Sequence, residues 1–400
     1  TTEIYTLSLH DALPISDDYY PRTGGVPAVS RYLCEGLAQK GYKVTVVTIK
    51  YGSLLARESF NGVDIVRFEI HTTRLKFISG EITEFKNYIQ QANVDILVNE
   101  CPEALTSRCL YPILVDLKDV IKILHVHGFG GLFQYPLKFE RNKLLDSLGR
   151  ILKAFKYRLF YFVYLRKYLS LYDLCLCLSE VDSSKKTLEK YAKRVKILRN
   201  AADDVFFRNF NRENPLFKYV QLANKRYCLS IANYFPYKNQ KGILLEFYKS
   251  VNDDISIIFI GKGSLEYLTE LIAYNLELEK IYGKKDVFFL SEVAREDIPD
   301  ILSNATLYLV GSLFEEFSIS IIEAMAKGVP FVSTNVGNTR LLPGGIIVES
   351  ISQMHKSIDL LLNNTELYKE YSRQGRAYAM QNCRTEYAVD QLEKYIQDLM

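Results

Sequence analysis

Short apolar runs that could form strands alternate with longer segments that could form helices, and this alternation passes along the chain twice. In the first half the strand-like runs are GVDIVRFEI, VDILVNE, IKILHVHG and LCLCLSE. In the second half they are YCLSIAN, SIIFIG, DVFFLS, TLYLVG and PFVST. Parallel strands need crossover connections, which are usually helices, so alternation of this kind indicates a doubly wound sheet. We therefore predict an α/β fold of two such domains, facing each other across a cleft.

The boundary between the two series falls near residue 200, shortly before the polar stretch RNFNRENP. We expect one domain over residues 17–200 and a second over residues 201–379. The tail from Thr365 to Met400 is predicted to be helical.

The first sixteen residues, TTEIYTLSLHDALPIS, match the rest of the chain poorly. They lack the basic start and the long apolar core of a signal peptide. The stretch TLSLHDALPI resembles one reading frame of a common DNA-sequencing adapter. We therefore expect residues 1–16 to be a non-native leader that leaves the first strand of the domain missing. The alternative is that IYTLSL itself forms a strand, which its period-two pattern permits.

The composition excludes some classes of protein. A net charge of +3 over 400 residues gives no reason to expect a general nucleic-acid binder. Seven cysteines occur without the spacing of a metal site, and Cys175 and Cys177 alternate along an apparent strand, so a reduced cytoplasmic protein is favoured over a disulfide scaffold. The aromatic run YRLFYFVYL is too short to cross a bilayer, and no transmembrane helix is expected.

Two loops of the second half lie where a doubly wound sheet binds ligands, at the carboxyl ends of strands. Gly261, Lys262 and Gly263 follow SIIFIG directly, and small and hydroxyl residues follow TLYLV in the stretch GSLFEEFSIS. Loops that lead into helix N-termini suit phosphate groups. A tight turn is the alternative explanation of the glycines.

The stretch SLFEEFSISIIEAMAKG sets Glu315 and Glu323 apart by seven residues, the second of them inside an apolar helix. This spacing, with EAMAKGVPFVST after it, resembles the retaining glycosyltransferases of family 4, also called glycosyltransferase group 1. The segments SIANYFPYKNQKGILLEFY, NAADDVF and PRTGGV are similar to further motifs of that family, in the same order. The resemblance extends from about Asp17 to the C-terminus. It implies the GT-B fold, with two Rossmann-like domains and an interdomain cleft, an N-terminal acceptor-side domain, and a last helix over about residues 380–400 that completes that domain.

The resemblance also implies a site. Glu323 is expected to hold the ribose of a nucleotide, Glu315 to contact the transferred sugar, and Lys238 to stabilise the departing diphosphate, with Lys241 or Lys262 assisting. Many relatives carry an arginine where this chain has Asn233. The implied donor-binding residues are Gly25, Asn233, Lys241, Gly261, Lys262, Gly263, Ser318, Ile319 and Glu323.

Neighbouring polar residues have simpler explanations. Glu316 is expected to be a surface charge near a helix N-terminus, where acids are favourable. Ser318 and Ser320 could cap the helix or donate to phosphate, and capping is the commoner role. The charge of Glu323 is expected to lie in a partly open cleft, because burial without a partner is costly.

The strand IKILHVHG ends in His127, which the resemblance implies is the active-site histidine, able to donate to a sugar hydroxyl or to phosphate. His125 is expected to pack deeper in the sheet. The implied mechanism is front-face attack by the acceptor hydroxyl, with retention of anomeric configuration. It needs neither an enzymatic nucleophile nor a metal ion, so the expected catalytic residues are His127, Lys238 and Glu315, with no cofactor beyond the nucleotide-sugar substrate.

Residues 138–168 contain nine Lys or Arg and two acids among Leu, Phe and Tyr. They predict either a basic amphipathic surface at the anionic inner face of the plasma membrane, facing a lipid-linked glycan, or a pair of solvated crossover helices. The expected partners are a nucleotide sugar and a glycan or lipid-linked acceptor, in bacterial surface-polysaccharide assembly. Two alternatives stay open: a GT-B-like sugar-nucleotide epimerase and a non-catalytic partner protein that binds a sugar nucleotide.

Overall fold

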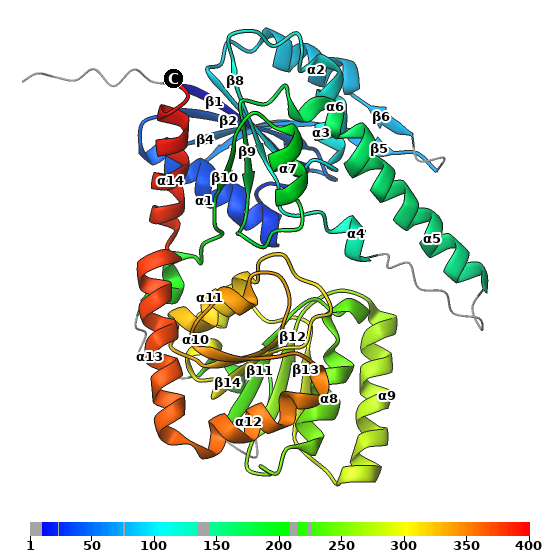
Figure 1. Cartoon of the computed structure of the whole chain (residues 1–400), viewed down its shortest axis with the longest axis vertical. Coiled ribbons are helices and arrows are strands. Elements are labelled where there is room, and N and C mark those ends of the chain that lie inside the picture. The colour runs from blue at the N-terminus through cyan, green and yellow to red at the C-terminus, as the bar shows by residue number, and fades with distance from the viewer. Residues whose placement is uncertain (1–9, 23, 75–76, 135–143, 209–213, 222–225) are drawn as a thin grey trace, which may run out of the picture. The chain divides into compact units, whose positions relative to one another are not determined.

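The computed structural model describes residues 10–22, 24–74, 77–134, 144–208, 214–221 and 226–400 (Figure 1). The chain divides into unit 1, which is Thr1–Asn200 with Thr385–Met400, and unit 2, which is Ala201–Arg384. The division after Asn200 coincides with the boundary that the sequence suggests. Each unit contains a mostly parallel sheet with helices on its faces, so the predicted α/β class with two doubly wound domains is confirmed.

The sheet of unit 1 has the strand order β10-β9-β8-β7-β1-β2-β4-β3. Neighbouring strands pair in parallel, except that β3 runs antiparallel to β4. The strands are β1 (Asp11–Ile15), β2 (Lys43–Ile49), β3 (Arg57–Phe60), β4 (Val63–Phe68), β7 (Ile96–Glu100), β8 (Ile121–His125), β9 (Leu174–Cys177) and β10 (Val195–Ile197). The chain builds outward from β1 through β2 to β4, then crosses to β7 on the other side of β1, which makes the β1–β7 boundary a topological switch point.

Residues 11–15 correct the expectation that the first strand is missing. They form β1, which lies between β2 and β7, with Ile15 opposite both Val47 and Asn99. Ala12, Leu13 and Ile15 are each at most 1% exposed, as suits a strand that is covered on both faces. The alternative strand IYTLSL lies outside the described residues.

The helices of unit 1 include one from the C-terminus of the chain. They are α1 (Gly25–Gln39), α2 (Ile82–Gln91), α3 (Leu105–Leu110), α4 (Gly131–Gln134), α5 (Leu144–Leu159), α6 (Arg166–Leu169), α7 (Lys185–Tyr191) and α14 (Thr385–Gln397). A π-helical turn, η3 (Phe160–Tyr164), joins α5 to α6, and a small hairpin of β5 (Ile70–Thr72) and β6 (Ile78–Gly80) precedes α2.

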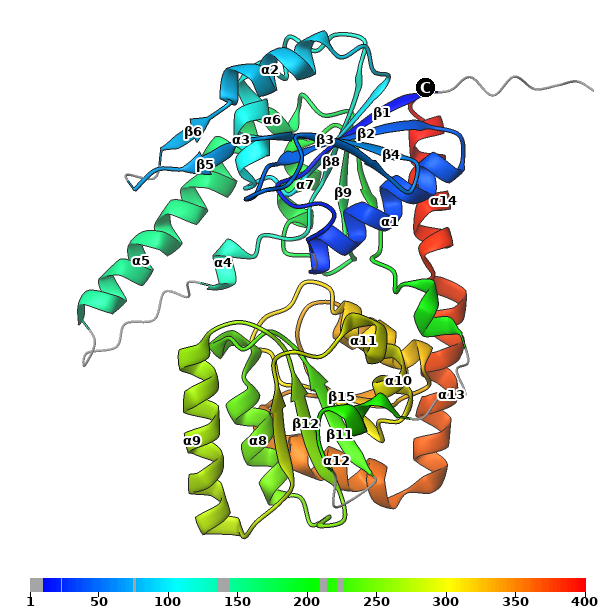
Figure 2. The ribbon, with the colours of Figure 1, turned by 180° about the vertical axis from the view of Figure 1, so that it is seen from behind.

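Helix α14 packs on α1, far from it in sequence (Figure 2). Lys40, which follows α1, pairs with Asp390 and Glu393 of α14, both at 2.7 Å. At Gly36 a Cβ atom would lie 2.3 Å from a methyl carbon of Val389, so the two helices meet where a side chain has no room. The C-terminal helix is thus a part of unit 1.

The sheet of unit 2 has the order β13-β12-β11-β14-β15-β16, with parallel pairing between neighbours. The strands are β11 (Tyr227–Ile231), β12 (Ser256–Ile260), β13 (Val287–Leu290), β14 (Leu307–Val310), β15 (Phe331–Thr334) and β16 (Gly345–Val348). The chain moves outward from β11 to β13 and then returns to β14 on the other side of β11. In sheets of this kind ligands bind at that switch point, outside the carboxyl ends of the strands.

Helices cover both faces of this sheet. They are α8 (Gln240–Lys249), α9 (Leu265–Tyr282), α10 (Ile298–Ser303), α11 (Ile319–Ala326), α12 (Met354–Asn363) and α13 (Thr365–Asn382). Short 3₁₀ turns at η6 (Pro236–Lys238) and η7 (Arg295–Asp297) lie between strands and helices. Across the described parts of both units, each helix is too short or too polar to cross a bilayer.

Candidate functional site

Two predicted catalytic residues of unit 2 meet at its switch point. Lys238 ends η6 in the loop after β11, and Glu315 lies in the loop after β14. The Lys238 ammonium pairs with the Oε1 oxygen of Glu315, and the Ser312 hydroxyl donates to the same oxygen at 3.0 Å. The side chains of Lys238 and Glu315 are 17% and 18% exposed. A cation and a carboxylate therefore lie together at the sheet edge where a ligand is expected.

The loop that carries Glu315 is held by the loops on either side of it. Leu313 donates its N–H to the Tyr237 carbonyl at 2.8 Å, and Thr334 donates its hydroxyl to the Ser312 carbonyl at 2.7 Å. Gly337 has a φ of +50°, and a Cβ atom there would lie 2.3 Å from the Glu315 carbonyl oxygen. The position of the Glu315 loop is thus fixed by contacts with both neighbouring strand ends.

Two expectations about this loop are wrong. Glu316 is 8% exposed rather than a surface charge, and its carbonyl oxygen accepts a hydrogen bond from the Asn338 N–H at 3.2 Å. Ser318 occupies the N-cap position of α11, but its side chain makes no capping hydrogen bond. Its hydroxyl instead lies 3.3 Å from that of Ser320. Ile319, the other predicted residue here, is the first residue of α11.

Glu323 has a protein partner that the sequence did not reveal. Its carboxylate lies on α11 with the side chain 4% exposed, and Arg295 of η7 donates to it at 2.5 Å. The expectation of a charge compensated only by an open cleft is therefore corrected. Burial raises the pKa of Glu323 above its usual value, and Arg295 offsets only part of that rise. Arg295 follows a different strand and belongs to no motif, so only the fold brings it to Glu323.

The glycines after β12 are explained by close approach of backbone. A Cβ atom at Gly261 would lie 2.1 Å from the Ala232 carbonyl oxygen. Gly263 has a φ of +142° and forms a parallel bridge with Tyr234. A Cβ atom at Gly263 would lie 2.8 Å from the Tyr234 carbonyl oxygen. The two glycines therefore let the β11 and β12 loops pack together. The Lys262 side chain between them is exposed.

The remaining predicted donor residues make other contacts or lie exposed within their own units. Lys241 of α8 pairs with Glu270 of α9 at 2.9 Å, and both side chains are more than 40% exposed. Asn233 contributes its carbonyl, which accepts from the Gln240 side chain at 3.0 Å. Gly25 begins α1 in unit 1 and is exposed. The structure therefore groups Lys238 with Glu315 and does not add Lys241 to them.

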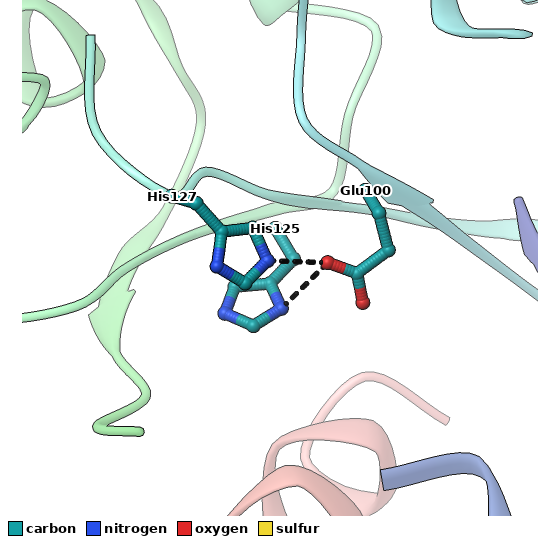
Figure 3. A group of neighbouring side chains, drawn as sticks. All are labelled: Glu100, His125 and His127. Atoms are coloured by element: carbon teal, nitrogen blue, oxygen red, sulfur yellow. Dashed lines mark hydrogen bonds and ion pairs between the residues drawn. The ribbon is translucent and has the colours of Figure 1, made fainter. Parts of the chain in front are cut away.

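Unit 1 carries a second polar cluster, at the end of β7 and β8 (Figure 3). Glu100 and His125 are register partners on these parallel strands, and His127 follows two residues later. One carboxylate oxygen of Glu100 lies 2.7 Å from Nε2 of His127 and 3.0 Å from Nδ1 of His125. Only the first contact has hydrogen-bond geometry. His127 was predicted from the sequence, whereas Glu100 was missed.

The charges in this cluster follow from its burial. The side chains of Glu100 and His125 are 3% and 1% exposed, and that of His127 is 8% exposed. Burial acts to raise the pKa of Glu100, but the two histidines outweigh it and hold the pKa at about 2. Burial and the neighbouring His125 lower the pKa of His127. At neutral pH the carboxylate is thus ionised, and the His127 imidazole is neutral.

The same three side chains are the group, within the described ranges, whose ligand atoms lie close enough together to bind a metal ion. Two observations weigh against a fit. The 2.7 Å distance between Glu100 and His127 is that of a direct hydrogen bond. In addition, Nε2 of His125 is buried and has no hydrogen-bond partner among the described residues, whereas metal-binding histidines usually donate their second N–H to one.

Comparison with known proteins places the chain in a family. A model described as Glycosyltransferase Family 4 matches residues 23–204, and one described as Glycosyl transferases group 1 matches residues 211–378. An uncharacterized glycosyltransferase of Haemophilus influenzae is 25% identical over 88% of this chain and 91% of its own length. The phosphatidylinositol N-acetylglucosaminyltransferase GPI3 subunit of Saccharomyces cerevisiae is 22% identical over 87% of this chain and 74% of its own length.

Solved structures show the same fold. Sucrose-phosphate synthase of Thermosynechococcus elongatus has a TM-score of 0.75 at 16% identity, over 98% of this chain and 99% of that one. Anabaena Alr3699/HepE, in complex with UDP and glucose, has a TM-score of 0.72 at 15% identity, over 97% and 100% of the two chains. The fold is therefore GT-B, with two Rossmann-like domains. The chain belongs to the glycosyltransferases, with residues 23–204 in family 4 and residues 211–378 in group 1.

Proposed function

We propose that this glycosyltransferase is a retaining hexosyltransferase that moves a sugar from a nucleotide-diphosphate sugar to a glycan or lipid-linked glycan, in surface-polysaccharide biosynthesis. The pairing of Lys238 with Glu315 at the switch point of unit 2 carries the proposal. The UDP and glucose in the HepE complex support a nucleotide sugar as donor. An epimerase would need no contacts to an acceptor, and the paired glutamates Glu315 and Glu323 do not favour it.

In this proposal the donor binds unit 2 by complementary charge. The Lys238 ammonium neutralises the diphosphate as the bond to the sugar breaks and negative charge grows on the leaving group. The Glu315 carboxylate, held by Ser312, accepts hydrogen bonds from hydroxyl groups of the sugar. Glu323 accepts hydrogen bonds from the ribose hydroxyls, and its raised pKa reflects a buried site that a polar ligand can share.

The reaction follows front-face displacement. The acceptor hydroxyl attacks the anomeric carbon on the face from which the diphosphate leaves, and a donor phosphate oxygen takes the hydroxyl proton. The C–O bond to phosphate breaks as the new glycosidic bond forms, so configuration is retained. Fixed charges and sugar contacts supply the catalysis, and the proposal assigns no step to a metal ion.

The acceptor side includes a surface suited to an anionic membrane. Along α5, η3 and α6 five large apolar side chains are 44–69% exposed: Leu152, Phe155, Leu159, Phe162 and Val163. Exposed basic side chains lie among them at Lys153, Lys156, Arg166 and Lys167. We call these nine residues the α5–α6 surface. Such a helix can place its apolar side chains among lipid acyl groups and its basic ones near phosphate.

This surface supports peripheral contact with the inner face of the plasma membrane, where a lipid-linked acceptor would be met. The yeast relative carries the name of a lipid, phosphatidylinositol, in its own name. Solvated crossover helices would not need five exposed large apolar groups. Residues 138–143, the first part of the predicted basic stretch, lie outside the described residues.

The proposal is tested by incubating the protein with nucleotide sugars and a membrane fraction that contains lipid-linked glycans. Transfer of labelled sugar to the lipid fraction, with the anomeric configuration of the donor kept in the product by NMR, is the expected result. An inverted product would contradict the retaining mechanism. Interconversion of sugar nucleotides without an acceptor product would indicate an epimerase, and donor binding without turnover a non-catalytic partner protein.

A further inference from the structure

Glu100 has no part in the reaction as set out above, yet it is an ionised carboxylate 2% exposed at the end of β7. Removing a carboxylate from water costs free energy unless its oxygens have partners, and even a paired buried carboxylate often adds no net stability to the fold. A residue held there at that cost needs a local explanation. The explanation lies in the ring that its oxygen contacts.

We propose that Glu100 is a positioning residue that fixes the tautomer of His127, so that Nδ1 of this ring accepts a hydrogen bond from a hydroxyl group of the bound sugar substrate. The inference rests on the proposed function for the identity of the substrate. The tautomer itself is a property of the free protein and can be tested without any substrate.

The geometry fixes the donor and the acceptor. An ionised carboxylate can only accept hydrogen bonds, so the ring nitrogen that it contacts must carry the proton. The contact at 2.7 Å is to Nε2 of His127, and it has hydrogen-bond geometry (Figure 3). In a neutral imidazole one nitrogen donates and the other accepts, so Nδ1 keeps its lone pair. The lowered pKa of both groups supports this charge state at neutral pH.

Parallel pairing places the carboxylate there. Glu100 ends β7 and lies opposite His125 at the end of β8, at the carboxyl edge of the sheet. His127 lies two residues beyond His125, with its ring centroid 4.2 Å from that of His125. A carboxylate that orients a histidine so that its other nitrogen can accept a proton or a hydrogen bond is a recurring catalytic arrangement.

This assignment differs from the role first expected for His127. A ring with a free proton on the substrate side would donate to a sugar hydroxyl or to phosphate. With Nε2–H engaged by Glu100, the neutral ring offers an acceptor instead. A hydroxyl group can donate to that acceptor, whereas a fully ionised phosphate cannot, which selects a sugar hydroxyl as the group that His127 contacts.

The first test is NMR of the protein labelled with ¹⁵N in histidine, at neutral pH and without substrate. The expected His127 signals show the proton on Nε2 and a bare Nδ1, identified by their loss in His127→Gln. In Glu100→Leu the ring loses its hydrogen-bond acceptor, so the Nε2–H form should no longer predominate. A wild-type ring protonated on Nδ1, or an unchanged tautomer in Glu100→Leu, would overturn the proposal.

The second test is kinetic. Glu100→Gln should lower kcat by about 10²-fold, the scale on which a positioned acid–base group acts, and change the KM for the donor by less than about twofold. The matched control is Glu180→Gln, because Glu180 is half exposed in unit 1 and pairs with Arg199. A kcat within about twofold of wild type in Glu100→Gln would overturn the proposal even if transfer activity is present.

A metal assay tests the alternative that Glu100, His125 and His127 bind a metal ion. The purified protein should contain less than 0.1 equivalent, on the order of background, of zinc or another divalent transition metal by mass spectrometry. One equivalent bound in the wild type and lost in Glu100→Gln would make the cluster a metal site and overturn the positioning role. If the wild type shows no transfer at all, the proposed function fails, while the NMR result still decides the tautomer.

Discussion

Lys238 and Glu315 are 77 residues apart in sequence and form an ion pair at the topological switch point of unit 2. The loop of Lys238 follows β11, and the loop of Glu315 follows β14, its neighbour in the sheet. The connection after β11 leads to one side of this strand pair and the connection after β14 to the other. The two loops therefore leave space for a ligand at that edge. The pair thus places a cation and a carboxylate together, the two groups that the proposed function assigns to the diphosphate and to the sugar hydroxyls.

Removing the Lys238 charge should slow the departure of the diphosphate. We expect Lys238→Ala to lower kcat by about 10²–10³-fold, because a fixed charge at a developing anion has an effect of this size. Steady-state release of the nucleoside diphosphate measures it. The matched control is Lys241→Ala, since Lys241 pairs with Glu270 on the helix surface. Equal losses in the two variants would refute the assignment of the site to Lys238.

Glu323 should contribute to ligand binding at a cost in stability. Its folded-state pKa is raised, so its contribution to the free energy of unfolding is most favourable below its unfolded pKa. That contribution is lost as pH rises through the folded pKa. At pH 7 we therefore expect Glu323→Gln to leave the Tm unchanged or raised, while nucleotide affinity falls about tenfold, the scale of one lost hydrogen bond to a charged group. Thermal unfolding and calorimetric titration measure the two effects.

The control for that variant is Glu366→Gln, because Glu366 is 85% exposed on α13 and pairs with Lys369. It should change neither quantity. A large fall in the Tm of Glu323→Gln would show instead that the contact with Arg295 is chiefly structural.

Unit 1 should lose stability at acidic pH. The folded-state pKa of His127 is lowered, so its neutral form is favoured and protonation below the unfolded value of about 6.5 opposes folding. Glu100 has its pKa lowered to about 2, so its contribution is present above its unfolded pKa and is lost as pH falls toward 2. The free energy of unfolding should therefore decrease from pH 6.5 downward, measured by urea unfolding at fixed ionic strength.

In His127→Gln the decrease below pH 6.5 should become shallower, because that variant lacks one titrating ring. An identical pH dependence in the two proteins would show that His127 does not titrate in this way. Any folding defect of the variant shifts the curve as a whole without changing its slope.

The contact between α1 and α14 leaves no room at Gly36. We expect Gly36→Ala to destabilise unit 1 by about 1–3 kcal/mol, because the new Cβ would overlap Val389. In a Val389→Ala background, Gly36→Ala should lower the free energy of unfolding less than it does in the wild type. Gly149→Ala on α5 is the control, since a Cβ atom there meets no atom of the described residues within 4 Å. Denaturant unfolding gives the free energy of unfolding of the wild type and of each variant. Additive effects of Gly36→Ala and Val389→Ala in the double variant would contradict the overlap.

The α5–α6 surface should bind anionic vesicles. We expect Phe155→Asp with Leu159→Asp to abolish sedimentation with vesicles that contain phosphatidylglycerol, because the two charges replace apolar groups that are 65% and 50% exposed. Nucleotide binding should stay unchanged. Wild-type binding should weaken as salt increases, and equal binding to neutral vesicles would contradict the role of the basic side chains.

The order of strands and helices could be predicted from the sequence because each buried parallel strand is an apolar run, and these runs recur at regular intervals. Lys238, Glu315 and Glu323 were accessible because each lies in a recognisable motif. Arg295 and Glu100 were not, since each reaches its partner through strand register and loop path rather than through local sequence. The first strand was misjudged because the resemblance of TLSLHDALPI to a sequencing adapter assigns residues 1–16 to a leader, whereas residues 11–15 pair with β2 on one side and with β7 on the other.

The measurement closest to the central claim is release of nucleoside diphosphate from UDP-, GDP- and ADP-sugars, with and without EDTA, in wild type and Lys238→Ala. We expect release from donors of one base, unaffected by EDTA and reduced about 10²-fold or more in the variant. Binding and release that depend on a divalent metal, or release that is equal in the two proteins, would contradict it.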